Sequence, residues 1–333
     1  MNILIIGLGS IGQRHLRNVK KIYPNANFFS YRRKFKTPSL DNFNNVKKYN
    51  LQSRYNIKYI KSINNLDKFK IDAAFVCTPS SFHVSEAIKI IDQNINIFVE
   101  KPLGSSLKNI EKLKKSLNSS KVVSMMGFQL RFSPLIVRLK EIISSAKFGK
   151  LNQILIHHGE NINNFHKFEN YKNIYASKKS LGGGVVLTQI HEIDYFLYLF
   201  ESFKITKIGS LSEKISSLKL DVEDTLLSIF KLKKNNQVVL CSMNLNYYEI
   251  PQKRILTLIY DNQKIETDFN KKTITYSNSK KIKIVRYKYG RNDLFVREIK
   301  YFFSHVEKNK KINKSLNLFN GIKTLKFALS LKR

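Results

Sequence analysis

Three glycines near the start of the chain have a spacing that suits dinucleotide binding. Gly7, Gly9 and Gly12 form the pattern Gly-x-Gly-x-x-Gly directly after the apolar run 2–6, and residues 10–22 suit a helix. Glycines permit a tight turn and a close approach of the backbone to a pyrophosphate, and a helix N-terminus adds amide donors and a positive dipole. The predicted contacts of a nicotinamide dinucleotide in this loop are Gly7, Gly9, Ser10, Ile11 and Gly12.

The end of the next strand-like run, residues 27–31, bears on the choice of cofactor. NAD-binding folds usually carry Asp or Glu there, which accepts hydrogen bonds from the adenosine ribose, but this chain has Arg32 and Arg33. A guanidinium offers a bidentate, charge-assisted fork to a 2′-phosphate. We therefore expect NADP(H) to be preferred to NAD(H); the alternative is that both arginines merely face solvent.

A lysine follows a buried strand at the point where the reacting end of such a cofactor would lie. Glu100-Lys101-Pro102 comes directly after the apolar run 95–99, at the carboxyl end of a strand, where doubly wound folds bind ligands. A desolvated lysine there would have a lowered pKa and could relay the proton of a hydroxyl whose carbon loses a hydride. The alternative is an ordinary solvated lysine, since the chain contains many.

The second chemical candidate is a histidine in residues 182–195, GGGVVLTQIHEIDY, where a glycine triplet leads into a helix. His191 lies in the middle of that helix beside Glu192, and Thr188 and Gln189 fall at neighbouring helical positions, so polar groups could face a cleft. His191 is a candidate general acid or base, the alternative being a structural hydrogen-bonder.

The order of the predicted elements indicates an α/β protein with two domains. Strand-like and helical runs alternate from residue 2 to about residue 126, which favours a doubly wound parallel Rossmann sheet. After about residue 150 come a long loop to residue 181, a helix over 186–200, four alternating strands over 222–231, 237–246, 254–260 and 282–287, and a helix over 293–306. We predict an NAD(P)-binding domain over 1–126 and, over 127–333, an α/β substrate domain with a large, mostly antiparallel open sheet that partner subunits could cover.

Composition narrows the classes of function. The apolar N-terminal run lacks the flanks of a signal peptide, and no apolar run is long enough to span a membrane, so a cytoplasmic protein is expected. Cys77 and Cys241 each lie in a strand-like run without metal-ligand spacing, so reduced core thiols and no metal site are expected. The net charge of +35 would attract polyanions, but the basic residues are scattered and come with many Asn and Ile, as A/T-rich codons would produce. Specific nucleic-acid binding therefore stays a minor alternative.

Five motifs in the same order along the chain resemble the Gfo/Idh/MocA family of oxidoreductases: GLGSIG, TPSSFH at 78–83, EKPLG at 100–104, GFQLRFSP at 127–134 and GGGVVLTQIHEID. The resemblance implies a Rossmann domain, a second domain whose open sheet serves oligomerisation, and redox chemistry on sugars or cyclitols. It also implies that Lys101 contacts cofactor and substrate hydroxyl, and that His191 is the histidine after the glycine triplet. Further cofactor contacts expected within these motifs are Thr78, Pro79, Glu100, Lys101 and Gln129.

The chain departs from the family at one position. Many members carry an Asp about four residues before the histidine, completing a proton relay, whereas this chain has Leu187 and Thr188 there. The departure leaves Lys101 and His191 as the acid/base pair. It also motivates an alternative, a cofactor-binding sensor or subunit without dehydrogenase activity.

The loop before the glycine triplet points to a class of substrate. Its sequence FHKFENYKNIYA, residues 165–176, is similar to that loop in family members associated with surface polysaccharide and amino-sugar synthesis. We expect hydride transfer between NAD(P) and a carbinol or keto carbon of a sugar or nucleotide-linked sugar, catalysed by a homodimer or homotetramer formed through the C-terminal sheet. The expected substrate contacts are Lys101, Lys172, Tyr175, Thr188, Gln189 and His191.

Overall fold

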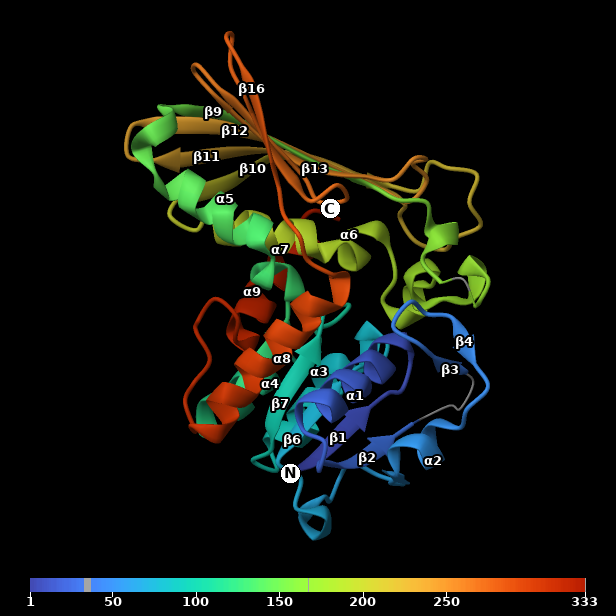
Figure 1. Ribbon diagram of the computed structural model, residues 1–333. Helices are drawn as coiled ribbons and strands as arrows, with labels where there is room; N and C mark the ends of the chain where they lie inside the picture. The colour runs from blue at the N-terminus through green and yellow to red at the C-terminus, as the bar shows by residue number, and fades with distance from the viewer. Residues whose placement is uncertain (33–36, 167, 333) are drawn as a thin grey trace.

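The apolar runs of the first part of the chain assemble into one parallel sheet. The computed structural model describes residues 1–32, 37–166 and 168–332. The sheet has the strand order β5-β2-β1-β6-β7-β8, and each pairing is parallel (Figure 1). Its strands are β1 (Asn2–Ile6), β2 (Asn27–Tyr31), β5 (Ile57–Tyr59), β6 (Ala73–Val76), β7 (Asn96–Glu100) and β8 (Ser124–Gly127).

Helices flank this sheet in packed pairs. Helix α1 (Ser10–Ile22) lies beside α8 (Arg291–Glu307), and α3 (Ser80–Ile91) lies beside α4 (Ile110–Ser119). Helix α1 buries Leu16 and Val19 against the sheet and carries Lys20 and Lys21 in its last turn, where their charges suit the negative end of the helix dipole. A short hairpin of β3 (Ser39–Leu40) and β4 (Val46–Lys47), followed by α2 (Leu51–Tyr55), continues after β2.

The end of the chain returns to this first sheet. The ring of Phe302 on α8 lies 5.8 Å from that of Phe75 in β6 and 5.7 Å from that of Phe98 in β7, measured between centroids. Helix α9 (Leu318–Ser330) packs against β8. The first turn of α8 therefore lies where the chain passes from the second sheet to the first (Figure 1).

The second sheet is mostly antiparallel and has the order β10-β11-β12-β9-β13-β14-β15-β16. Only the pairing of β12 with β9 is parallel within the described residues. Its strands are β9 (Leu151–Gly159), β10 (Lys204–Glu213), β11 (Thr225–Lys234), β12 (Gln237–Asn246), β13 (Lys253–Tyr260), β14 (Lys264–Asp268), β15 (Thr273–Ser277) and β16 (Ile282–Arg286). This combination of sheets is the fold predicted from the sequence.

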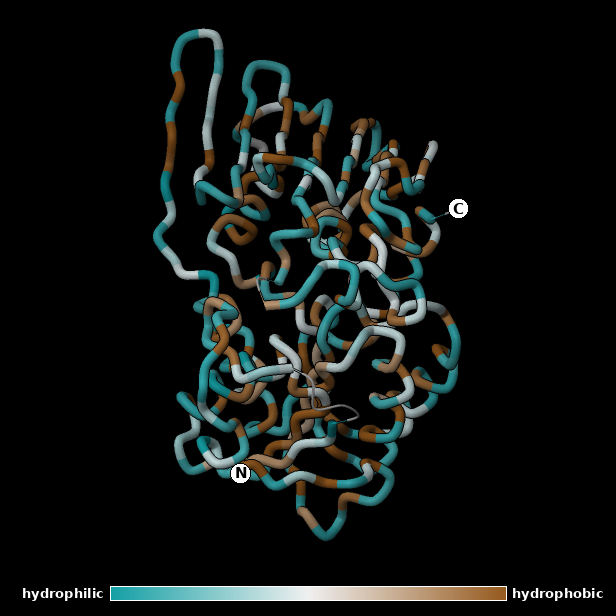
Figure 2. Tube along the Cα trace, turned by 90° about the vertical axis from the view of Figure 1, so that its right-hand side faces the viewer, coloured by the Kyte–Doolittle hydropathy of each residue, from teal (hydrophilic) through white to brown (hydrophobic). Residues whose placement is uncertain are grey.

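One face of the second sheet carries helices, whereas none of the described helices lies on the other. Helices α5 (Pro134–Ser144), α6 (Val185–Thr188) and α7 (Ile190–Leu199) lie on the side of the first sheet (Figure 1). The β15–β16 hairpin extends beyond the rest of the sheet (Figure 1), and Figure 2 shows hydrophobic and hydrophilic residues alternating along the strands. The exposed apolar residues on this face include Leu211, Leu227, Ile229, Leu240 and Ile284.

Three expectations need adjustment. The helix expected over 186–200 is interrupted at Gln189, which has φ −92° and ψ 29°. The strand expected over 222–231 begins only at Thr225, because the carboxylate of Asp224 accepts hydrogen bonds from the amides of Ile215 and Ser216 and holds a loop there. Residues 254–287 contain β14 and β15 between the two expected strands.

In the described ranges, every helix is too short or too polar to cross a bilayer.

Candidate active site

The glycine loop has the shape that a dinucleotide requires. Gly7 adopts a φ of +91°, and a Cβ on it would lie 2.9 Å from the carbonyl oxygen of Cys77. A Cβ on Gly12 would lie 2.0 Å from the carbonyl oxygen of Gly7, whereas a Cβ on Gly9 would meet nothing within 4 Å. The turn and the packing of α1 therefore demand glycine at 7 and 12, while the space above Gly9 is open. The first-turn amides, including those of Ser10 and Ile11, have no partner within α1 and suit a pyrophosphate.

The other expected cofactor contacts follow the same edge of the sheet. Thr78 and Pro79 come after β6, Glu100 ends β7, and Gln129 lies two residues beyond β8. The imidazole of His83 lies between the carbonyl oxygens of Thr78 (2.6 Å) and Pro102 (2.7 Å) and so links the ends of β6 and β7.

The two arginines expected at the adenosine end fall near the end of β2. Arg32 follows that strand directly, and Arg33 lies outside the described residues.

Lys101 points from the end of β7 toward the second half of the chain. Its Nζ donates a hydrogen bond of 2.8 Å to the carbonyl oxygen of Thr188. Burial lowers the pKa of Lys101 to about 8, Glu100 opposes this shift, and the charge of Arg254 adds to it. An appreciable fraction of the amine is therefore neutral near physiological pH.

The interruption of the helix at Gln189 makes that carbonyl available. In a continuous helix the amide of Glu192 would bond the carbonyl of Thr188. Here the amide of Glu192 instead donates to the carbonyl of Gln189 at 3.2 Å. The Thr188 carbonyl is thereby left to accept from Lys101, which joins the two halves of the site.

His191 lies on the next turn and faces the same place. It is 6% exposed, its ring lies 6.3 Å from that of Phe128, and neither ring nitrogen has a hydrogen-bond partner among the described residues. Burial first, then the charges of Lys101 and Arg254, hold the pKa of His191 well below its usual value. The imidazole is therefore neutral, and Lys101 lies near enough for its charge to affect this pKa.

Several further polar atoms at this place are buried without a protein partner. Buried polar groups in proteins are nearly always hydrogen-bonded, so a cluster of exceptions fits a site for a ligand rich in hydroxyl groups. Within the described residues the unpartnered atoms here include Thr188 Oγ1, Gln189 Oε1, Glu192 Oε2 and the hydroxyl of Tyr247.

Tyr175 joins the same group, whereas Lys172 does not. Burial raises the pKa of Tyr175 to about 12, with Glu100 adding to the effect and the Thr188 side chain opposing it. Burial raises the pKa of Tyr247 well above its usual value, with the Thr188 side chain opposing this shift and Tyr175 adding to it. Lys172 is exposed, and no side-chain contact links it to Lys101 or His191 in the described part of the chain.

Sequence reasoning missed a buried ion cluster beside His191. The Glu192 carboxylate is fully buried and accepts from Arg254 Nε at 2.6 Å, with His158 Nδ1 3.2 Å away. Burial alone would raise the pKa of Glu192, but Arg254 and His158 hold it well below its usual range. Glu160 lies 3.7 Å from His158 Nε2.

The sequence did carry a signal for this cluster. Arg254 and His158 are directly paired between β13 and β9. In each strand they share the parity of buried residues, Leu256 and Leu258 for Arg254, and Ile154 and Ile156 for His158. A basic residue on the inward face of an alternating strand needs a buried partner, and that pattern could have identified both.

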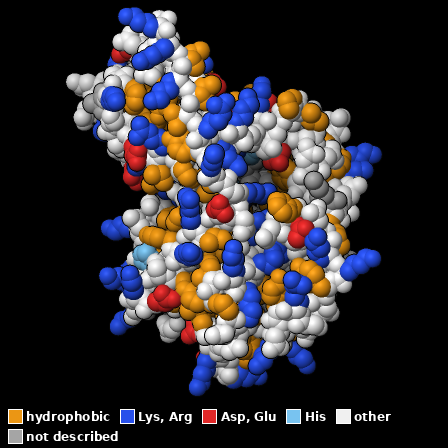
Figure 3. Space-filling model, in the orientation of Figure 1, with side chains coloured by type: hydrophobic (Ala, Val, Ile, Leu, Met, Phe, Trp, Pro, Cys, Tyr) orange, Lys and Arg blue, Asp and Glu red, His pale blue; other side chains and the backbone are white. Residues whose placement is uncertain are grey.

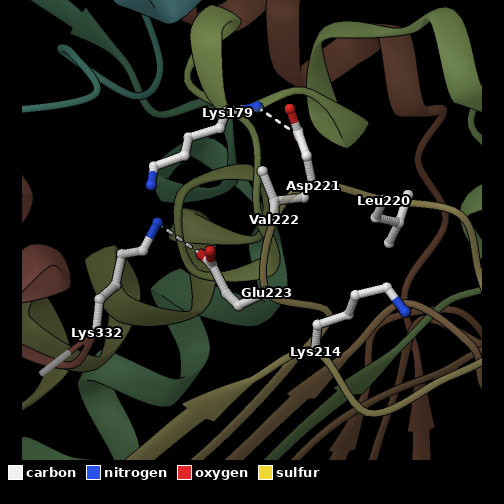
Figure 4. A pocket seen from close by; sticks show the side chains of 7 residues that line it. All are labelled: Lys179, Lys214, Leu220, Asp221, Val222, Glu223 and Lys332. Atoms are coloured by element: carbon white, nitrogen blue, oxygen red, sulfur yellow. Dashed lines mark hydrogen bonds and ion pairs between the residues drawn. The ribbon is translucent and has the colours of Figure 1, made fainter.

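A cavity of about 400 Å³ lies beside the glycine triplet (Figure 4). The Glu223 carboxylate there fills the space where a Cβ of Gly184 would lie, 2.2 Å from its oxygen, and Lys332 Nζ lies 2.9 Å from Glu223 Oε1. The amide of Val185 donates to the Glu223 carbonyl at 3.0 Å. This contact fixes the start of α6. The lining residues are Lys179, Lys214, Leu220, Asp221, Val222, Glu223 and Lys332.

Comparison with known proteins agrees with this geometry. Residues 1–128 match the model of the Gfo/Idh/MocA group, described as "Oxidoreductase family, NAD-binding Rossmann fold". The chain is 27% identical over 206 residues to glucose-6-phosphate 3-dehydrogenase of Bacillus subtilis, covering 61% of this chain and 55% of that protein. The matched segment thus spans about half of that relative's length.

Solved structures resemble the chain along nearly all of its length. Levoglucosan dehydrogenase in complex with NADH superposes with a TM-score of 0.78 at 14% identity, covering 99% of this chain and 95% of that one. UDP-N-acetylglucosamine 3-dehydrogenase from Acidithiobacillus ferrooxidans superposes with a TM-score of 0.73 at 17% identity, covering 100% and 96%. At these identities the likeness establishes a shared fold.

Proposed function

We propose that this chain, whose residues 1–128 belong to the Gfo/Idh/MocA family of oxidoreductases, transfers a hydride between a nicotinamide and a carbinol or keto carbon of a sugar. The observation that carries the proposal is the meeting of Lys101 and His191. Lys101 follows β7, whose carboxyl end lies on the same edge as the glycine loop, and its amine bonds the backbone one turn before His191. A carbon bound between them would lie near the reactive end of a dinucleotide held by that loop.

The side chains divide the proton chemistry between them. A neutral Lys101 accepts the proton of the substrate hydroxyl during oxidation, and the ammonium returns it during reduction. The neutral imidazole of His191 orients the same hydroxyl, and the Thr188 carbonyl holds the lysine in place. When bound, the nicotinamide ring supplies the position that takes or gives the hydride.

The preference for NADP(H) rests on Arg32 and Arg33. Because the carboxylate usual after β2 is replaced by two guanidiniums, we propose that they pair with the 2′-phosphate. Titration of the protein with NADPH and NADH, followed by nucleotide fluorescence, tests this choice directly. Tighter binding of NADH would contradict it.

The proposed substrate is a sugar or a nucleotide-linked sugar of the kind used in polysaccharide and amino-sugar synthesis. Support comes from the loop 165–176 and from Tyr175, which lies beside Thr188 in the site. One protein of similar fold is a UDP-N-acetylglucosamine 3-dehydrogenase. Among the proposed substrate contacts, Lys172 lies on the exposed surface of this loop, while Thr188, Gln189 and Tyr175 line the interior of the site.

The proposed functional form is a homodimer or homotetramer built through the second sheet. Its uncovered face exposes Ile229 and Leu240, 54% and 52% accessible, on adjacent strands. Apolar surface of this kind is typical of a contact between subunits.

The test of the function uses the absorbance of the reduced nicotinamide with a panel of sugars. Oxidation of at least one sugar is expected, together with loss of turnover but not of cofactor binding in Lys101→Met. The exposed Lys112 on α4 provides the control variant Lys112→Met, which should keep full activity. Cofactor binding without turnover of any sugar would favour the alternative of an inactive cofactor-binding subunit. That alternative is suggested by Thr188, which stands where many family members have Asp.

A further inference from the structure

A buried contact joins helix α1 to the residue before Lys101. His15 of α1 and Glu100 at the end of β7 are 85 positions apart in the chain, yet His15 Nε2 lies 2.7 Å from Glu100 Oε1. The other carboxyl oxygen, Glu100 Oε2, accepts from the backbone amide of Lys101 at 3.1 Å. The helix that begins at the glycine loop is thus connected to the backbone of the lysine.

Both side chains of this contact are enclosed by protein. His15 is fully buried, and the centroid of its ring lies 5.2 Å from that of Phe75 and 5.1 Å from that of Phe98. Glu100 is 5% exposed, and a Cβ on Gly127 of β8 would lie 3.2 Å from its Oε1, so the glycine leaves the space that the carboxyl fills. His15 cannot touch a substrate, and it acts on the site only through Glu100.

The hydrogen bond between them has one direction. A carboxylate oxygen can only accept, so Nε2 of His15 carries the hydrogen and donates it. Nδ1 of the same ring is buried without a partner among the described residues, which leaves the ring this single polar contact. A charge-assisted bond in apolar surroundings is strong, and loss of its donor is costly.

Other titratable groups near Glu100 do not replace this donor. Glu298 of α8 has both carboxyl oxygens unpartnered within the described ranges, and burial first, then Glu100, raise its pKa. Burial and then Glu100 likewise raise the pKa of the Cys77 thiol. Both groups are acids without a positive charge. His15 and the Lys101 amide are therefore the contacts that hold the carboxylate.

We propose that His15 and Glu100 are positioning residues, which hold the backbone of Lys101 against helix α1 and place a negative charge beside its amine. In this role Glu100 acts through Lys101, which differs from the cofactor contact expected for it from its motif. The inference rests on the proposed function, because it concerns the lysine of that same site.

The charge of Glu100 has a measurable effect on Lys101. Lysine and arginine side chains are spread over the face of the molecule in Figure 3, so the surroundings of Lys101 must set it apart. Burial lowers its pKa to about 8, and Glu100 is the first group that opposes this shift. Arg254 and Arg291 add to the lowering, whereas Glu192 opposes it. Removal of the Glu100 charge alone should move the pKa of Lys101 below 8.

The first test follows Lys101 itself and needs no turnover. The protein is labelled with a trace of acetic anhydride at a series of pH values, and acetylation of Lys101 is quantified by mass spectrometry of its peptide. In the wild type, labelling should rise with an inflection near 8. In Glu100→Gln, which keeps the shape of the side chain, the inflection should fall by about one pH unit, and the NADH Kd from fluorescence titration should change little.

Variants of His15 test the hydrogen bond. In His15→Leu the donor is lost, and kcat for a sugar should fall about 10- to 100-fold with NADH affinity little changed. His15→Gln keeps an N–H donor and should recover much of the activity. The control is Asn18→Ala, which removes a buried contact of α1 with Asn292 of α8 without touching Glu100. It should lower the Tm and leave kcat and the labelling inflection unchanged.

Three outcomes overturn the assignment. They are a Lys101 inflection that stays near 8 in Glu100→Gln, a marked loss of NADH affinity in Glu100→Gln, and equal losses of kcat in His15→Leu and His15→Gln. The second would make Glu100 a direct cofactor contact. If His15→Leu does not fold, the labelling of Glu100→Gln still decides. A protein that turns over no sugar would refute the proposed function, and the labelling would decide this inference independently.

Discussion

The pH dependence of turnover follows from the burial of Lys101. The pKa of this lysine falls from its usual 10.5 to about 8. At pH 7 the neutral fraction of an amine with the usual pKa is about 0.03%, and at a pKa of about 8 it is about 9%, a gain of roughly 300-fold in the form that accepts a proton. His191 and Tyr175 do not titrate in the same range, because the pKa of His191 lies well below its usual value and that of Tyr175 is about 12. Glu192 raises the pKa of His158, which lies one step further from Lys101 in the same buried cluster.

The inflection that belongs to Lys101 is therefore expected near pH 8. In the direction of oxidation, kcat/KM should rise about tenfold per pH unit up to an inflection near 8 and then level off. In the direction of reduction it should fall above that value. Initial rates from the reduced-nicotinamide absorbance give both profiles.

The matching variant is Lys101→Met, which keeps the length of the side chain and removes the amine. It should lose about 10²- to 10⁴-fold in kcat and lose the inflection, while NADH still binds. An inflection that stays near 8 in Lys101→Met, or a wild-type inflection near 10, would refute the assignment of the proton to this lysine.

Three other perturbations have definite expected outcomes. Gly9→Ala should fold normally, because its Cβ would meet nothing within 4 Å, but should bind NADH about tenfold or more weakly in fluorescence titration. Gly12→Ala should lower the Tm or prevent folding, because its Cβ would lie 2.0 Å from the carbonyl oxygen of Gly7. Equal effects of the two variants would contradict the loop geometry. Glu298, fully buried with both carboxyl oxygens unpartnered among described residues, has a pKa raised by burial and by Glu100, so wild-type stability should fall by up to about 1.4 kcal/mol per pH unit above 4.5. Glu298→Gln lacks this loss, so urea unfolding should show its advantage growing from pH 5 to pH 8, and a constant difference would disprove the buried neutral carboxyl. Ile229→Asp on the uncovered sheet face should sediment as a monomer, and an unchanged assembly would exclude that face as the interface.

The parts of the site that could be predicted from the sequence depend on short patterns of neighbouring residues. The glycine loop depends on residues within one turn of each other, and its strand and helix read clearly on either side. Lys101 follows the mostly buried strand β7, so its place at the carboxyl edge of a parallel sheet follows from topology alone. For these residues, local pattern and global fold agree.

The remaining parts depend on contacts that sequence spacing does not encode. Arg254 and His158 come from distant segments and both meet Glu192 only because β13 pairs with β9 in the second sheet. No proline or glycine marks the helix interruption at Gln189. The interruption instead accompanies a long-range contact, the hydrogen bond from Lys101 to the Thr188 carbonyl. Lys172 was expected in the site from its loop, but its exposed side chain is not in contact with Lys101 or His191.

The central claim is that one bound nicotinamide and one sugar carbon lie between Lys101 and His191. A crystal structure of the protein with NADPH and a turned-over sugar tests it most directly. A sugar hydroxyl is expected within about 3 Å of Lys101 Nζ and close to a ring nitrogen of His191, with its carbon facing the nicotinamide C4. A sugar bound elsewhere, or a nicotinamide ring turned away from Lys101, would contradict the claim.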